Sequence, residues 1–589
     1  MSTYKLAVII FVVFTAQAYA YTTHIAAPAV LLGVDRGVLT NVTLNIVPGD
    51  GVIVVNNGST TVASDTLQSV HIAVNYATNY LNVSENKYNF TFIIGNNDSN
   101  VSGPSAGLAL TLLTISGLKQ RPLSGNFTLT GTISPDGVVG PIGGVFDKVQ
   151  AAKSIGSRFV LVPYVNNTTS EYMLYYLSQQ AYGTPLVEVS NVSQALPYAF
   201  GSKKPTALSF NLTTDYKPDQ ISNASEICPS CNGTQFLQLT NFTFNFTENE
   251  ISRINETLFG SVRNQLSSQL EQYRKLASKG YYYTGADLAF IEDPTAFIFA
   301  NYNTSQYVAM QIISNVTAYC NSLNYMPNMT ASNYELIVGA QTRLAWADVT
   351  LSAAMAELNA SQTSDQVILS LAEAAPAQSW CAAAHEMYAM ANSSTVSPTV
   401  TSSKVREDAL NGLSAARARY GNQFYVDAAN YSISNGDYAA ALYSLTYANV
   451  FYNYTDANYS KTSSLVSNAL SSAQGLWPTQ FALQGSFYLS EAGLNSMNSS
   501  QYFSFVSDAY TTAALSLSLD STNNDIRSNL VPAYEAAVVP TGLTDQINQI
   551  SSELSAIMAV LVMILALMFV IFLILLYILL ASRRRGARR

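Results

Sequence analysis

Charged side chains are scarce in this chain. Asp, Glu, Lys and Arg make up 11% of its 589 residues, against about 25% in typical globular domains. The 28 basic and 37 acidic residues give a net charge of −9, which argues against a nucleic-acid-binding protein, since such proteins need basic surfaces to neutralise phosphates. Hydrophobic residues make up 48%. This content argues against disorder and allows several domains with packed cores.

Cysteine is also rare. Four cysteines are too few to staple a chain of this length into a small disulfide-rich fold. The spacing of Cys228 and Cys231 could serve a zinc ion, but a structural zinc site usually takes four ligands. Cys320 and Cys381 lie far away in helical patterns. We therefore favour disulfides Cys228–Cys231 and Cys320–Cys381 over a metal site, and we expect no metal and no cofactor.

Two apolar runs predict how the chain meets a membrane. Lys5, an apolar run over residues 6–14 and the small-residue site around Ala20 predict a signal peptide over residues 1–20; the alternative, a membrane anchor, needs a longer run. Residues 557–580 contain no charge and no proline, enough to cross a hydrocarbon core of about 30 Å as a helix. The alternative is a buried core helix. Five arginines follow within residues 583–589, and clustered arginines stay on the cytoplasmic side.

These patterns predict a single-pass cell-membrane protein. We expect a transmembrane helix over residues 556–581, a cytoplasmic basic tail over 582–589 and an extracytoplasmic body. The body holds 25 Asn-x-Ser/Thr sequons, spread from Asn41 to Asn498. Their spread fits a glycoprotein whose glycans and neutral polar side chains supply solubility in place of charge. Such a surface would tolerate acid, and the composition resembles that of cell-surface proteins of thermoacidophilic archaea.

Strand and helix patterns divide the body into two regions. Short strands alternate with helices up to about residue 200, which predicts an α+β domain over 21–200. The expected strands cover residues 42–47, 51–55, 88–94, 127–133 and 159–163. The expected helices cover residues 67–80, 106–118 and 145–155. Residues 201–249 form a polar linker or strand-bearing insert in this interpretation.

Helical patterns dominate residues 250–550. Ala-rich stretches separated by polar breaks predict helices over 344–358, 372–391, 406–420 and 438–452. Residues 435–441 are typical of a helical hairpin joint and faintly resemble a tetratricopeptide repeat. Because no fixed period is present, we expect a non-repeating α-helical domain rather than a solenoid.

The chemistry is concentrated between residues 97 and 148. Gly103-Pro104-Ser105-Ala106-Gly107 follows a strand and opens a helix, where a serine hydroxyl is exposed near unpaired backbone N–H groups that can stabilise an oxyanion. The alternative is an ordinary helix start, which also favours Pro and Ser.

A serine nucleophile needs a base. His71 lies in a helical pattern, where an ordinary half-buried histidine is the usual case. Lys148 begins a helix among apolar neighbours, and desolvation there would lower its pKa enough for it to accept a proton. The alternative for Lys148 is a surface lysine beside Asp147.

Several segments in one order resemble the proteolytic domain of the Lon proteases, a Ser–Lys dyad family (peptidase family S16). The resemblance covers about residues 25–200, and 43 residues separate Ser105 from Lys148, which matches the family's spacing. The segments are Asp50-Gly51, Ser69-Val70-His71-Ile72-Ala73, Gly103–Gly107, Leu129-Thr130-Gly131, Val139–Gly144, Lys148 and Phe159–Pro163.

The resemblance implies roles for individual residues. Ser105 resembles the nucleophile, Lys148 the general base, and Thr130 the threonine that orients the lysine, while Gly103, Pro104, Ala106 and Gly107 form the nucleophile turn and oxyanion region. Ser102 and Thr132 replace acidic residues that are frequent in the family, which leaves substrate preference in doubt. The family also implies a homo-oligomeric ring, such as a hexamer.

Two functions follow. The first is a membrane-anchored extracytoplasmic serine endopeptidase that cleaves unfolded or flexible proteins. No Gly-x-x-x-x-Gly-Lys-Ser/Thr loop occurs in these residues, so we expect no AAA+ unfoldase in this chain and no need for ATP. The alternative is a cell-surface structural or interaction glycoprotein that carries an inactive Lon-like domain. Sequons at Asn97 and Asn100 precede the serine turn, where a glycan would narrow access or the sequon would stay unused.

Overall fold

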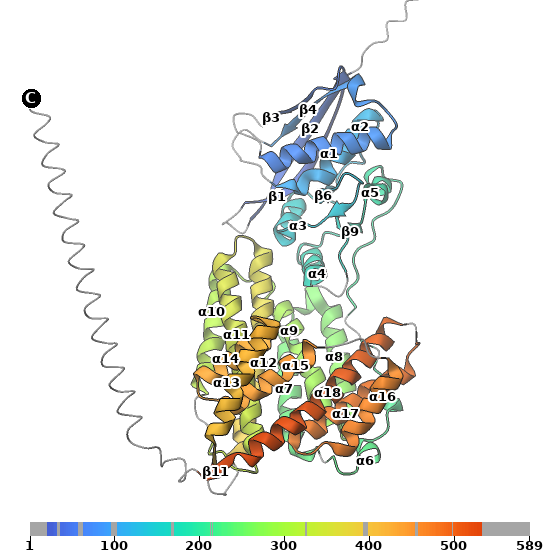
Figure 1. Ribbon diagram of the computed structural model, residues 1–589. Coiled ribbons are helices and arrows are strands. Elements are labelled where there is room, and N and C mark those ends of the chain that lie inside the picture. Colours follow the sequence, from blue (N-terminus) through green and yellow to red (C-terminus); the bar gives the residue numbers. More distant parts are fainter. Residues whose placement is uncertain are drawn as a thin grey trace, which may run out of the picture.

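The computed structural model shows an α/β region joined to a larger helical region (Figure 1). The described residues are 20–31, 36–56, 63–95, 103–166, 170–211, 214, 216–231, 233–323, 327–392, 399–453, 458–497 and 499–532. The expected signal segment, apart from Ala20, and the expected membrane span and basic tail lie outside these ranges. Within them, no helix combines the length and apolar character needed to cross a bilayer.

The α/β region begins with a four-stranded sheet. Its strands are β1 (Tyr21–Leu31), β2 (Arg36–Pro48), β3 (Ile53–Asn56) and β4 (Tyr88–Ile94). The spatial order is β1-β2-β4-β3, in which β2 pairs antiparallel with β1 and β4 while β3 runs parallel to β4. In β2, alternate residues Val42, Leu44 and Ile46 are buried, so one face of the sheet packs on the interior.

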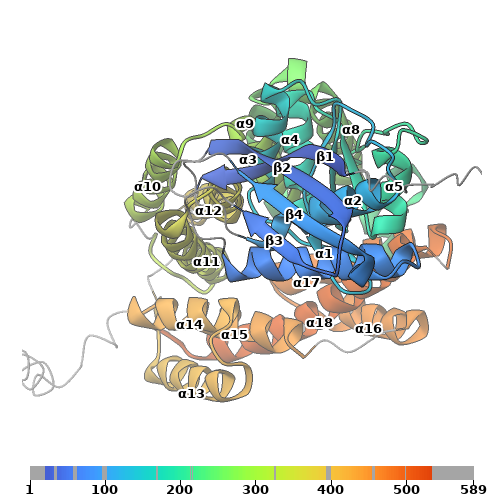
Figure 2. The same cartoon turned by 90° about the horizontal axis from the view of Figure 1, so that it is seen from above.

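Two helices pack against this sheet. They are α1 (Ser64–Tyr80) and α2 (Gly107–Leu118), and Figure 2 shows α1 running alongside the strands. Every residue of α2 except Leu118 is buried, as is typical of a helix that is apolar on all sides. The central helix that carries the serine turn is thus held rigidly inside the domain.

A second, smaller sheet completes the α/β region. Its parallel strands are β5 (Thr128–Leu129), β8 (Val160–Pro163) and β9 (Leu186–Val189), beside a short hairpin of β6 (Thr132–Ile133) and β7 (Val139–Gly140). The helices are α3 (Val145–Ser154), α4 (Ser170–Tyr182) and α5 (Val192–Ala199). The single strand expected over 127–133 is therefore broken at Thr130-Gly131, where the backbone bonds to the serine turn.

The helical region packs around several contiguous apolar cores. Its helices are α7 (Leu237–Ser252), α8 (Glu256–Ser278), α9 (Tyr282–Asn301), α10 (Gln306–Ser322), α11 (Tyr334–Ala360), α12 (Ser364–Ala391), α13 (Ser403–Tyr420), α14 (Phe424–Ser434), α15 (Tyr438–Phe451), α16 (Tyr459–Ser472), α17 (Leu476–Leu494) and α18 (Ser500–Ser528). A small antiparallel pair, β10 (Thr399–Thr401) and β11 (Leu530–Pro532), lies at its far end. The hairpin joint expected at residues 435–441 is confirmed, because α14 and α15 meet there.

The linker expected over residues 201–249 is wrong at its C-terminal end. Helix α7 begins at Leu237, because Leu239, Phe244 and Ile251 form a buried stripe at helical spacing. Before it, the described part of the segment holds only single turns and no strand: η3 (Pro218–Gln220), α6 (Ala224–Ile227) and η4 (Thr234–Phe236). The structure joins Cys228 to Cys231 and Cys320 to Cys381 as disulfides, and the second ties α10 to α12.

Candidate active site

The serine turn is formed by a short 3₁₀ helix, η2 (Pro104–Ala106), that leads directly into α2. Gly103 precedes it at φ 107°, a conformation that favours glycine. A Cβ on Gly107 would lie 2.7 Å from Ile133 Cγ2 and 2.9 Å from the Ile133 backbone N, so only glycine lets the turn pack this closely on β6. Gly103 and Gly107, on either side of Ser105, are thus favoured for different reasons: Gly103 for its backbone conformation and Gly107 for close packing on β6.

The broken strand holds the serine turn in place. The Gly131 N–H donates to the Ser105 carbonyl at 2.8 Å, and the Leu108 N–H donates to the Gly131 carbonyl at 3.0 Å. The Thr130 hydroxyl donates to the same Ser105 carbonyl at 3.3 Å. Thr130 was expected to bond the Lys148 amine, whereas its bond here goes to the backbone of the nucleophile, whose position it helps to fix.

Lys148 approaches Ser105 from the first turn of α3. Its side chain has only 4% exposure, and it lies among the buried side chains of Val145, Phe146 and Val149. The Lys148 Nζ donates to the Ser105 Oγ at 3.1 Å. Two residues that are far apart in sequence and lie on different helices are thus brought within hydrogen-bond reach.

Burial changes the protonation of this amine. Desolvation lowers the pKa of Lys148 to about 8, and the negative charge of Asp365 partly opposes this shift. A neutral amine in this position can accept the serine proton. The first N–H groups of a helix have no intrahelical partner, so the amides around Ser105 are suited to a developing oxyanion. The arrangement is that of an acyl-transfer centre built from a serine hydroxyl and a buried amine.

Comparison with known proteins gives the same class. Residues 36–197 match the family described as the Lon protease (S16) C-terminal proteolytic domain. The chain is 42% identical to Lon protease 2 of Bacillus subtilis over 66 residues, 11% of this chain and 12% of that protein. It is 30% identical to the Lon protease of Elusimicrobium minutum over 141 residues, 23% and 17%, and 48% identical to that of Phenylobacterium zucineum over 61 residues, 10% and 8%.

The chain therefore spans less than a fifth of the length of these relatives. Residues 36–197 form a Lon-type proteolytic domain, and this likeness supports a protease. The helical region lies outside the matched residues.

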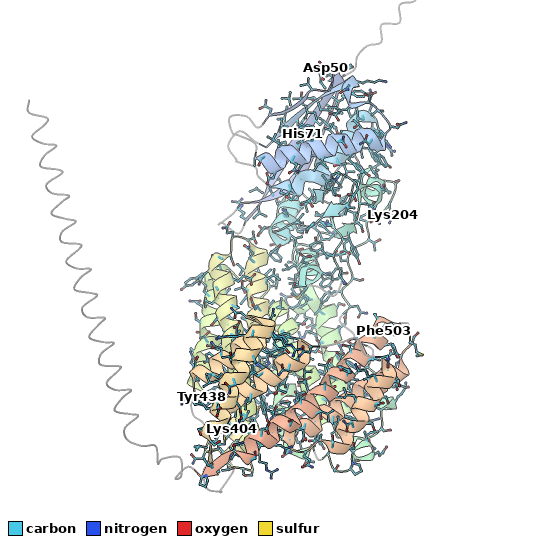
Figure 3. The ribbon with its side chains drawn as sticks, in the orientation of Figure 1. Asp50, His71, Lys204, Lys404, Tyr438 and Phe503 are labelled. Atoms are coloured by element: carbon cyan, nitrogen blue, oxygen red, sulfur yellow. A yellow bond between two sulfur atoms is a disulfide. The ribbon has the colours of Figure 1, made fainter. Side chains whose placement is uncertain are left out.

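None of the three histidines is buried, and the Ser105 hydroxyl bonds Lys148 instead. His24, His71 and His385 are all exposed, and Figure 3 labels His71 on α1. His385 Nδ1 lies 3.5 Å from the Tyr319 hydroxyl in the helical region. Lysine is thus the basic side chain that the fold presents to Ser105. Within the described part of the chain, no group of three or more metal-ligating side chains is present.

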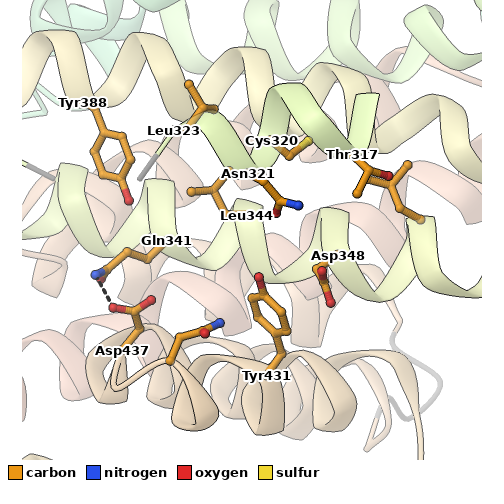
Figure 4. Close-up of a pocket in the computed structure, with 12 residues that line it drawn as sticks. Thr317, Cys320, Asn321, Leu323, Gln341, Leu344, Asp348, Tyr388, Tyr431 and Asp437 are labelled. Carbon is orange, nitrogen blue, oxygen red and sulfur yellow. Dashed lines mark hydrogen bonds between the residues drawn. The ribbon is translucent and has the colours of Figure 1, made fainter. Parts of the chain in front are cut away.

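A cavity of about 250 Å³ lies inside the helical region, remote from the serine turn (Figure 4). Asp348, Tyr388, Tyr431 and Asp437 are among its lining residues. The Gln341 side-chain amide donates to Asp437 at 2.6 Å, drawn as a dashed line in Figure 4. The cavity is lined entirely by helical-region residues, so it is separate from the Ser105–Lys148 pair.

The contact between the starts of α3 and α12 could not be predicted from the sequence. Asp365, on α12, contacts the backbone of α3 beside Lys148, and Asp147, on α3, contacts the start of α12. A separation of more than two hundred residues hides such a contact in one sequence. The signal that could have pointed to it is that α3 begins after Gly143-Gly144, with no side chain of its own to cap it.

Proposed function

We propose that this chain is a serine endopeptidase in which Ser105 is the nucleophile and Lys148 the general base. The observation that carries the proposal is the 3.1 Å contact between the Lys148 amine and the Ser105 hydroxyl, made by an amine that is almost fully buried. A surface lysine beside Asp147, the alternative for Lys148, would be exposed and charged and would not reach Ser105.

The reaction follows from this geometry. The Ser105 Oγ attacks a peptide carbonyl while its proton passes to the neutral Lys148 Nζ. The tetrahedral intermediate collapses, the C–N bond breaks, and the Lys148 ammonium gives the proton to the departing amine. Lys148 then takes a proton from water, whose oxygen attacks the acyl-Ser105 ester, and returns it to the Ser105 oxygen as the acid product leaves. Every proton transfer uses the same amine, which ends the cycle neutral.

The substrates that we propose are unfolded or flexible proteins, cleaved without ATP. No phosphate-binding Gly-x-x-x-x-Gly-Lys-Ser/Thr loop occurs in these 589 residues, so nothing in them would unfold a substrate. A peptide must therefore reach the Ser105 turn in an extended form. We further propose that the domain acts in a homo-oligomeric ring, as the family resemblance implies.

We place both regions outside the cytoplasm, anchored through residues 556–581. Two disulfides support an oxidising compartment. Every sequon asparagine within the described residues is exposed or half-buried, so each of these sites is compatible with a glycan on the folded protein.

Cleavage of unfolded casein by the full-length chain, without ATP, tests the proposal. Ser105→Ala and Lys148→Ala should each lower kcat by about 10³-fold or more, because removing one member of a nucleophile–base unit costs nearly as much as removing both. Lys153→Ala is the matched control, since Lys153 lies on the same helix but is exposed, and it should retain full activity.

The outcomes separate the two functions. Equal cleavage by wild type, Ser105→Ala and Lys148→Ala would refute these roles. A folded wild type that neither cleaves casein nor reacts at Ser105 with a fluorophosphonate probe would instead favour an inactive Lon-like domain on a structural surface protein.

A further inference from the structure

The helix that carries Lys148 is capped by a side chain from the other region of the molecule. Gly144, at the N-cap of α3, has no side chain to accept the free N–H groups of the first turn. Instead, the Val145 N–H donates to Asp365 Oδ2 at 2.6 Å and the Phe146 N–H donates to Asp365 Oδ1 at 2.7 Å. One buried carboxylate, 220 residues away in sequence, thus satisfies both donors.

The contact is reciprocal. Ser364 begins α12, and its N–H donates to Asp147 Oδ2 at 2.9 Å while its hydroxyl donates to Asp147 Oδ1 at 2.5 Å. Each helix therefore receives an N-terminal acceptor from a carboxylate on the other helix, where negative charge is also favoured by the helix dipole. In α12 this acceptor adds to the helix's own cap, the Thr363 hydroxyl, which accepts from the Gln366 N–H. We call these four hydrogen bonds, formed by Asp147, Ser364, Asp365 and the first two amides of α3, the two-helix clasp.

The clasp is closely enclosed. Asp147 and Asp365 have 1% and 7% exposure. A Cβ on Gly144 would lie 2.4 Å from Val30 Cγ2, and a Cβ on Gly37 would lie 1.7 Å from the Asp147 carbonyl oxygen, so β1 and β2 press on the same turn. Figure 1 shows the tip of the α11–α12 hairpin beside α3. The two regions are thus in close contact at this point.

We propose that Asp365 is a positioning residue for the Ser105–Lys148 pair, through which the helical region holds α3 so that the Lys148 amine stays within reach of the Ser105 hydroxyl. This inference rests on the proposed peptidase function. It also gives the helical region a task in that function: it completes the active-site helix of the proteolytic domain.

Asp365 also acts on Lys148 through its charge. Burial raises the pKa of Asp365 to about 6, while the amides of Phe146 and Val145 oppose that rise, so the carboxylate is ionised in the range where Lys148 titrates. Its charge raises the pKa of Lys148 against the desolvation that lowers it. The charges that act on Lys148 or Asp365 come from Asp147 and from this pair itself, and the Asp365 charge also acts on Tyr175 and Tyr182 of α4. The other titratable residues of α3 and of β1, β2 and α4, which pack against it, are Lys153, Tyr21, His24, Arg36, Glu171, Tyr172 and Tyr176.

The two effects predict a distinctive result for Asp365→Asn in the full-length chain. Loss of the clasp should lower the plateau rate of casein cleavage by about 10- to 100-fold, because small misplacements of a catalytic group are costly. Loss of the charge should move the rise of activity with pH downward by about one unit. Competitive labelling of the Lys148 amine with acetic anhydride, measured by mass spectrometry across pH, should show the same downward shift.

Three further variants make the test specific. Asp365→Glu keeps the charge, so its rate should fall while the pH dependence stays. Ser364→Ala removes one hydrogen bond of the clasp and should behave likewise, with a smaller loss. Asp508→Asn on α18 removes a half-buried carboxylate whose pKa is also raised to about 6, and it should change neither the rate nor the labelling.

If the pH midpoints of cleavage and of Lys148 labelling rise or stay unchanged in Asp365→Asn, the inference is wrong. Loosening the contact without removing a charge that acts on Lys148 would only hydrate the amine and raise its pKa. If Asp365→Asn does not fold, Asp365→Glu and Ser364→Ala decide the matter: a full rate in both overturns the positioning role. Failure of the proposed function is distinguishable, because a wild type that cleaves nothing still allows Lys148 labelling to test the clasp.

Discussion

Lys148 is subject to two opposing influences at the level of the single residue. Its amine is buried in the first turn of α3, where desolvation favours the neutral form, and Asp365 supplies the one negative charge that opposes this. The resulting pKa of about 8 lies close to the range in which a general base is most effective. A lysine without burial would stay charged at neutral pH and could not accept the serine proton.

This balance predicts the pH dependence of cleavage. The base must be neutral, so kcat/KM should rise about tenfold per pH unit below about 8 and level off above it. Lys148→Arg should be inactive at every pH, since an arginine does not lose its proton in this range. The measurement is kcat/KM for a fluorogenic peptide from pH 5 to pH 10.

The same pH profile should be measured for Thr130→Val. Its hydroxyl bonds the Ser105 carbonyl rather than the amine of Lys148, so the variant should lower the plateau rate by a factor of about 10 or less, the usual range for one neutral hydrogen bond, and leave the midpoint near pH 8. A midpoint displaced by Thr130→Val would show that this threonine acts on the lysine after all, and a wild-type rate that stays constant from pH 6 to pH 9 would contradict the assignment of the base.

At the level of elements, the start of α3 depends on one of two adjacent glycines. Gly144 has φ +67° and a Cβ there would meet Val30 Cγ2 at 2.4 Å, whereas a Cβ on Gly143 would have nothing within 4 Å. Gly144→Ala should lower the free energy of unfolding by about 1–2 kcal/mol from the left-handed backbone alone, with further loss from the contact with β1.

Gly143→Ala is the matched control for Gly144→Ala. Urea unfolding followed by circular dichroism measures the stability of both variants, and casein cleavage reports whether Lys148 has moved. Gly144→Ala should lose activity together with stability, and Gly143→Ala should keep both. Equal behaviour of the two variants would mean that the cap of α3 is not sensitive to this backbone.

Much of the element order could be predicted from the sequence because it rests on local pattern. The strand over 88–94 has the predicted bounds, and the helix over 106–118 differs by one residue at its start, since each carries its own periodicity. The prediction of a single strand over 127–133 was wrong, because long-range hydrogen bonds with the Ser105 turn interrupt the strand at Thr130-Gly131. The clasp could not be predicted, since it joins Asp147 to a helix of the other region.

At the scale of the whole molecule, two adjacent acidic groups of the helical region are buried, and neither forms an ion pair with a basic side chain of the described residues. Desolvation raises the pKa of Glu292 to about 7 and that of Asp293 to about 8, both on α9. The Tyr273 hydroxyl donates to Glu292 at 2.8 Å, and the Thr247 and Ser379 side chains beside Asp293 only partly oppose the rise of its pKa. Both groups bind protons more tightly in the folded state than in the unfolded state. Lowering the pH therefore stabilises the folded protein over the range between the folded and the unfolded pKa of each group.

The sign of this effect is opposite to ordinary acid denaturation, and it can be measured. From pH 8 to pH 5 the folded protein takes up protons at Glu292 and Asp293 while the unfolded chain, with pKa values near 4, takes up few. The free energy of unfolding should therefore rise by about 6 kcal/mol, at up to about 1.4 kcal/mol per pH unit for each group. All three tryptophans lie in α11, α12 and α17, so their fluorescence in urea reports the helical region specifically.

Asp293→Asn should reduce this pH dependence, because the amide does not titrate, whereas Asp525→Asn, at an exposed position of α18, should leave it intact. A helical region that instead loses stability steadily between pH 8 and pH 5 would show that these carboxylates are ionised and solvated in the folded protein.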